Sequence, residues 1–97
     1  MSENVFADIG LPDPELHLAK ARIVQTLSRI IRAKGMTQVE VGARLGLSQP
    51  KVFALLSGQF RGYSIERLLR FANALNHNVH IVIEAGEAEE AGRLVVA

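Results

Sequence analysis

The stretch that decides the fold is Thr37–Gly58, TQVEVGARLGLSQPKVFALLSG, which contains start and stop residues for two short helices. Thr37 and Glu40 have the spacing of a capping box, in which each side chain accepts a hydrogen bond from the other residue's backbone N–H. Gly46 ends the first helix, and Ser48 two residues later is a favourable N-cap for the second. The pattern predicts two helices joined by a tight turn, a helix-turn-helix.

Longer helices are predicted on both sides of this motif. Asp13-Pro14 is a strong helix start, and apolar residues then recur at helical spacing until Gly35. After the motif, Ser64 caps a helix whose apolar stripe runs to Leu75. A single helical turn is also expected within residues 4–10. The 97-residue chain therefore predicts one all-α domain, a bundle of four or five helices.

Residues 78–84 have the period of a strand, because Val79, Ile81 and Ile83 alternate with His80, Val82 and Glu84. No other stretch resembles a strand that could pair with it, so its backbone groups would be unpaired on both edges. We therefore expect residues 78–84 to pair with the same segment of a second copy, which places Val79, Ile81 and Ile83 in a homodimer interface. The chain then divides into an N-terminal segment 1–12, a domain 13–84 and a flexible tail 85–97.

The net charge of +1 hides a strong segregation along the chain. Residues 20–70 carry ten Lys and Arg side chains against two Glu, whereas residues 1–19 have four acidic groups and no basic one. Residues 71–97 have one Arg against four Glu. A basic centre between acidic ends suits a polyanionic partner, although solvated charges on a helical surface would give the same count.

Several classes of protein are not expected from this composition. Cysteine is absent, which fits a reducing cytoplasm and removes disulfides, thiolate metal sites and cysteine nucleophiles. No apolar run approaches the roughly 20 residues of a membrane span, and no export signal follows Met1. The three histidines are scattered and no nucleophile has an evident base. We expect a cytoplasmic protein that is not an enzyme and holds no metal or cofactor.

The second helix of the motif begins with side chains suited to nucleic acid. In a helix-turn-helix, this end of the helix meets base edges in the major groove. Gln49 can bond adenine at N6 and N7 together, and Lys51 can bond guanine or a phosphate. Pro50 and Phe53 are unusual outward residues: Pro50 removes a donor, and Phe53 could touch a thymine methyl or instead a protein partner.

The motif resembles the phage Cro and repressor family, also called the xenobiotic-response-element (XRE) family. The residues that carry the resemblance are Thr37-Gln38, Glu40, Leu45-Gly46, Ser48-Gln49, Val52 and Leu55–Gly58. The resemblance implies a lambda-repressor-like bundle that binds double-stranded DNA at an inverted repeat. It implies that Gln38 touches the DNA backbone, that Ser48 and Gln49 open the recognition helix, and that Arg61 lies in a phosphate-contacting loop.

One departure from the family pattern is Gly42, where the family usually has Ala. Glycine fits there but lowers helix stability by about 0.8–1 kcal/mol relative to alanine. A second open point concerns Arg61 and Arg67, which flank the loop after the recognition helix. Each is as suited to a solvated surface as to a DNA contact.

Residues 4–12 and the strand-like 79–84 narrow the resemblance to a subgroup of HigA-type antitoxins. That resemblance implies a repressor of its own operon that also neutralises a RelE/HigB-like toxin. Two alternatives stay open on the same fold. One is a stand-alone phage-type or metabolic regulator without a toxin, and the other is an adaptor that binds only protein.

Overall fold

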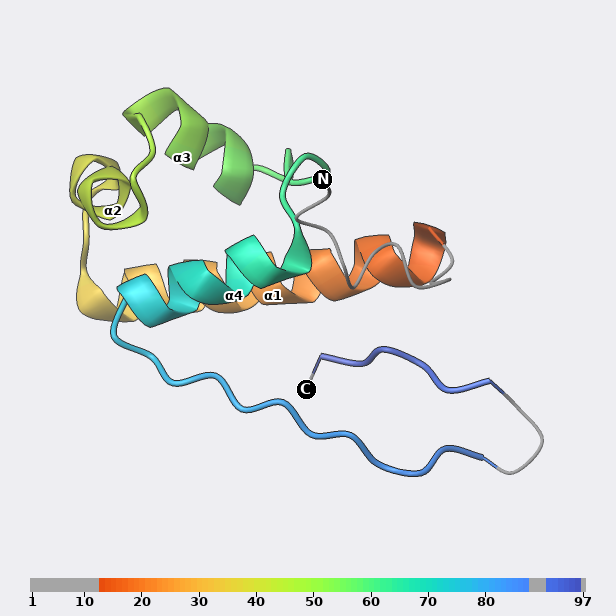
Figure 1. Cartoon of the computed structure of the whole chain (residues 1–97). Coiled ribbons are helices and arrows are strands. Elements are labelled where there is room, and N and C mark those ends of the chain that lie inside the picture. Colours follow the sequence, from red (N-terminus) through yellow and green to blue (C-terminus); the bar gives the residue numbers. More distant parts are fainter. Residues whose placement is uncertain (1–12, 88–90, 97) are drawn as a thin grey trace.

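Four helices form the part of the chain described by the computed structural model, residues 13–87 and 91–96 (Figure 1). They are α1 (Asp13–Lys34), α2 (Gln38–Leu45), α3 (Gln49–Leu56) and α4 (Ile65–Ala74). The prediction of an all-α bundle with a helix-turn-helix is confirmed. The single turn expected within residues 4–10 lies outside the described residues.

Helices α1 and α4 lie side by side and form the base on which the motif rests (Figure 1). The ends of α1 are matched to the helix dipole, with Asp13 and Glu15 in its first turn and Arg32 and Lys34 in its last. The chain then turns at Gly35, whose φ of 65° belongs to the left-handed region. The predicted start and end of this helix are therefore confirmed.

The capping box before α2 is present as predicted. The Thr37 hydroxyl accepts from the N–H of Glu40 at 3.1 Å, and the Thr37 N–H donates to a Glu40 carboxylate oxygen at 2.8 Å. The turn to α3 passes through Gly46, which has a φ of 73°. The Ser48 hydroxyl then accepts from the N–H of Lys51. These local bonds satisfy backbone donors that a helix start leaves unpaired.

Gly42 is buried where α2 approaches the turn. The Leu47 N–H donates to its carbonyl oxygen at 2.9 Å. A β-carbon at this position would overlap the Leu47 carbonyl oxygen and would lie 3.5 Å from a Val52 methyl. Glycine therefore permits a close approach of backbone to backbone, a role that its low helix propensity does not reveal.

The core joins all four helices. Its largest fully buried side chains come from α1, α2, α3, α4 and the residue that follows α4: Leu27, Val41, Val52, Leu55, Leu68 and Leu75. Because α3 contributes two of these residues, its inner side is fixed to the base, and its outer side remains available.

The strand expected over residues 78–84 is not formed in the described part of the chain, and its pairing with a second copy stays a prediction. The chain leaves α4 at Asn76, with a φ of 65°, and residues 77–87 are extended without a ladder. Alternation of side chains cannot make a strand unless a second segment supplies the hydrogen bonds. Val79 is half-buried against the core, whereas Ile83 is 94% exposed.

Part of the predicted tail lies against α1. Residues 93–96 line a groove of about 410 Å³ together with residues of the first turns of α1, between Pro14 and Arg22. The N–H of Leu94 donates to the Glu15 carboxylate, and Leu94 and Val96 pack against the core. The end of the chain therefore covers part of α1 on the side away from α3 (Figure 1).

Candidate nucleic-acid interface

Helix α3 projects from the bundle, with its buried and exposed residues on opposite sides. Val52 and Leu55 have no exposed surface, whereas Ser48, Gln49, Pro50 and Lys51 are all exposed. Proline is tolerated in this first turn because the N–H that it lacks would have no helical partner. Four of the predicted site residues are thus brought together at the exposed start of one helix.

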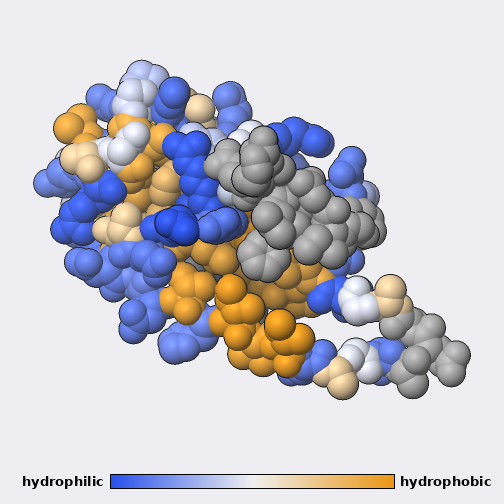
Figure 2. Space-filling view, in the orientation of Figure 1, coloured by the Kyte–Doolittle hydropathy of each residue, from blue (hydrophilic) through white to orange (hydrophobic). Residues whose placement is uncertain are grey.

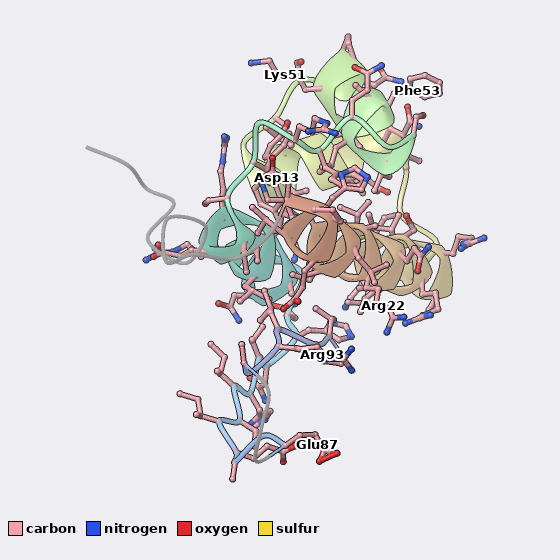
Figure 3. The ribbon with its side chains drawn as sticks, turned by 90° about the vertical axis from the view of Figure 1, so that its right-hand side faces the viewer. Asp13, Arg22, Lys51, Phe53, Glu87 and Arg93 are labelled. Carbon is pink, nitrogen blue, oxygen red and sulfur yellow. The ribbon has the colours of Figure 1, made fainter. Side chains whose placement is uncertain are left out.

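The outer side of α3 has two chemically different edges. Lys51 and Phe53 point in different directions from the helix (Figure 3). Gln49 and Phe53 are four residues apart and therefore share a side, which gives one edge an amide and an aromatic ring. Phe53 is 59% exposed. The groove of duplex DNA is long enough to contact both edges of α3 at once.

Between these edges, Pro50 and Ala54 share a side at the same four-residue spacing. Ala54 is half-buried and was not among the predicted site residues. Its spacing from Pro50 is the signal that could have identified it. The middle of the outer side therefore has small or rigid side chains, which permit a close approach of the helix backbone to a partner.

Gln38 begins α2 and is half-buried at the N-terminus of that helix. Its predicted contact with the DNA backbone remains a prediction. Val39, the next residue, is 62% exposed. The start of α2 thus presents an amide and an apolar side chain beside the capping box of Thr37.

The loop between α3 and α4 contains Arg61, whose side chain is exposed. Its backbone carbonyl accepts from Nζ of Lys20, on α1, at 3.2 Å. The neighbouring Phe60 is buried, and its ring centroid lies 4.9 Å from that of His17. The loop is therefore attached to α1 at two consecutive residues, and sequence analysis had not identified either attachment.

Two other arginines make contacts within the chain. The Arg67 guanidinium lies 5.0 Å from the Tyr63 ring centroid and 5.6 Å from that of Phe71, within the range of cation–π attraction. Arg44 donates to the carbonyl oxygen of Ala74 at 3.1 Å and so connects α2 to the end of α4. Arg67, which sequence analysis left open, has a structural role in the loop.

Burial lowers the pKa of Lys20 from its ordinary value of 10.5, and repulsion from the nearby Arg61 guanidinium lowers it further. The unfolded chain therefore holds this proton more tightly than the folded chain does. Between the folded pKa and 10.5, the free energy of unfolding therefore increases as pH rises. This increase is lost again as pH falls through the folded pKa.

As pH rises from neutrality towards 10.5, we expect the free energy of unfolding of wild type to increase relative to that of Lys20→Met. Denaturant unfolding of both proteins at matched pH values measures this difference. Lys34→Met, which removes an exposed lysine of the same helix, is the control. A wild-type to Lys20→Met difference that is independent of pH would contradict the expected effect.

No group of three or more metal-ligating side chains occurs among the described residues. His17 contacts the Phe60 ring, and Nδ1 of His77 lies 3.0 Å from the Leu75 carbonyl oxygen. Across the same described ranges, no helix is long and apolar enough to cross a membrane.

A short helix that presents polar residues from its first turn, next to a basic loop and on a fixed helical base, defines a helix-turn-helix DNA-binding protein. The sequence model of the helix-turn-helix domain family matches residues 5–84, and the chain belongs to this family. A solved structure described as "Putative XRE Family Transcriptional Regulator" is 38% identical, with a TM-score of 0.81, over 89% of this chain and 98% of that chain. No protein with a curated description matches.

These similarities confirm the predicted class, a DNA-binding transcriptional regulator of the XRE type. The match covers both the helix-turn-helix and the helices that support it.

Proposed function

We propose that this protein is a cytoplasmic transcriptional repressor that reads an inverted-repeat operator through α3. The observation that carries the proposal is the exposed first turn of α3, held on the bundle by buried Val52 and Leu55. The surrounding residues 20–70 contain ten basic and two acidic groups, which favours attraction to the phosphate backbone. In this role the protein binds DNA and catalyses no reaction.

The candidate residues divide into two roles. Gln49 would bond base edges, with Pro50 and Phe53 shaping the contact and Phe53 touching a thymine methyl. Ser48, Gln38, Lys51 and Arg61 would contact the DNA backbone and set the register. Lys51 belongs to the second group because it points away from the edge that Phe53 occupies (Figure 3).

Gln49→Ala is expected to reduce discrimination between operator and random DNA by roughly 5- to 150-fold, with a smaller loss on random DNA. Lys51→Ala is expected to weaken binding to all sequences and to reduce the slope of log affinity against log salt by about one. Gel shifts over a salt series measure both effects, with an operator enriched from random duplexes by the wild-type protein.

Gln25→Ala and Lys34→Ala are matched controls, because both side chains are exposed on α1. Equal losses on operator and random DNA in Gln49→Ala would contradict base reading. Absence of any DNA binding by the wild-type protein would instead favour the protein-binding adaptor.

We further propose that the unit that binds DNA is a homodimer in which residues 78–84 of two copies pair as antiparallel strands. Ile81 and Ile83 are 64% and 94% exposed, and Val82 between them is 77% exposed. Figure 2 shows the apolar side chains of this segment gathered on one side of the molecule. In both ribbon views this side is opposite α3, so pairing here leaves α3 free (Figures 1 and 3).

A chain truncated after His77 is expected to be monomeric in light scattering, whereas the full chain is dimeric. Ile83→Asp tests the same contact without removing chain, because a residue that is 94% exposed contributes little to the fold of one copy. The two-fold arrangement would place the recognition helices about 34 Å apart, in successive major grooves. A dimer that survives both changes would exclude residues 78–84 as the interface.

An antitoxin role is the narrower form of this proposal, in which the repressor also neutralises a RelE/HigB-like toxin. It is supported by the resemblance of residues 4–12 and 79–84 to the antitoxin subgroup and by apolar side chains outside α3, including Leu18 and Val95. Co-purification with the product of the adjacent gene tests it. A neighbouring gene whose product neither resembles such a toxin nor binds would favour a stand-alone regulator.

A further inference from the structure

A buried lysine connects α1 to the loop that follows the recognition helix. Lys20 is only 5% exposed, because its position, four residues after Leu16 and three before Ile23, lies on the side of α1 that faces the core. Its Nζ donates to the carbonyl oxygen of Arg61, 41 residues away, at 3.2 Å. The contact therefore fixes one peptide unit of the loop relative to the base of the domain.

A second contact attaches the preceding residue of the loop. The Phe60 side chain is 6% exposed and its ring lies against that of His17, with centroids 4.9 Å apart. His17 and Lys20 are three residues apart and so lie on the same side of α1. With the Phe60 ring and the Arg61 carbonyl both held by α1, the Arg61 side chain is left exposed on the loop.

A lysine at this buried position is expected to cost folding stability. Burying an ammonium group is costly, and a carbonyl oxygen is a neutral partner that compensates only in part. The Arg61 guanidinium adds repulsion, which together with burial lowers the pKa of Lys20. A phosphate in contact with Arg61 would attract both cations and so relieve this repulsion.

We propose that Lys20 is a positioning residue for DNA binding: it holds the loop from inside the domain so that Arg61 can contact a backbone phosphate. Lys20 itself touches no DNA in this arrangement. The inference rests on the proposed function, since it names the internal group that orients one of the proposed phosphate contacts.

A double-mutant cycle tests the inference with wild type, Lys20→Met, Arg61→Ala and the double variant. The probe is random-sequence duplex DNA over a salt series, at a temperature where circular dichroism shows all four proteins to be folded. We expect each single variant to bind about three- to tenfold more weakly and with a shallower salt slope. In the Arg61→Ala background, Lys20→Met should then change affinity by less than about twofold.

A merely structural role for Lys20 would give a different result. Loss of folded protein would leave the salt slope unchanged, and it would weaken binding as much in the Arg61→Ala background as in wild type. Either result overturns the inference, as does an Arg61→Ala variant that binds normally. Lys34→Met controls for the loss of one positive charge on α1.

Failure of the inference is distinguishable from failure of the proposed function. Wild-type protein that binds DNA and is weakened by Lys51→Ala, but shows additive Lys20 and Arg61 effects, contradicts only the positioning role. Wild-type protein that does not bind duplex DNA contradicts the proposed function and the inference together.

Discussion

Leu55→Ala is expected to lower the free energy of unfolding by about 2–5 kcal/mol. Leu55 has no exposed surface and lies on the inner side of α3, in the core that joins the helices. Truncation removes apolar contacts and leaves a cavity that a small domain can fill only by moving its helices. Since whole domains are stable by about 5–15 kcal/mol, this loss would be a large share of the total stability.

Denaturant unfolding followed by circular dichroism measures this loss. Leu56→Ala is the matched control, because it makes the same substitution at the next residue of α3, which is only half-buried. The control should lose clearly less stability. Equal losses for the two variants would show that α3 does not pack with the orientation described, which would also move Gln49 and Lys51 from the exposed side.

Gly42→Val is expected to destabilise the domain by about 1–3 kcal/mol or more and to weaken DNA binding by displacing α3. The β-carbon of the new valine would overlap the carbonyl oxygen of Leu47. This oxygen belongs to the backbone, so it cannot move aside as the end of a flexible side chain can. The turn that Leu47 opens also sets the position of Ser48, the N-cap of α3. The change should therefore reduce stability and operator binding together.

Two comparisons separate steric overlap from helix propensity. Ala43→Val places the same side chain at the next, exposed position of α2 and should cost only the difference in propensity, well under about 1 kcal/mol. Gly42→Ala should be destabilising even though alanine favours helix by about 0.8–1 kcal/mol. A Gly42→Ala protein more stable than wild type would show that propensity, and not the approach to Leu47, dominates at this position.

The helix-turn-helix was predictable in detail because its determinants are local. Thr37 and Glu40 bond each other's backbone across three residues, and Ser48 bonds the N–H of Lys51 in the same way. Such bonds form wherever the helix forms, whatever packs against it. The exposure of Gln49 followed as well, since Val52 and Leu55 identify the inner side of a short helix.

Residues 78–84 show where a periodic pattern is insufficient. Alternating apolar residues describe a surface that would suit a strand, but the ladder depends on a partner that the described part of one chain does not provide. The exposed Ile81 and Ile83 are consistent with a partner in a second copy. Pairing between copies is a property of the assembly, so no pattern within one sequence could establish it.

By itself, the sequence determined the helix boundaries, the caps and the side of α3 that faces outward, because these depend on residues three or four positions apart. Only the tertiary structure decided that the Lys20 ammonium bonds the Arg61 carbonyl oxygen and that Arg44 bonds the carbonyl oxygen of Ala74. Each of these depends on how elements pack in space. The bond from Lys20 to Arg61 spans 41 residues, a separation over which local propensity carries no information.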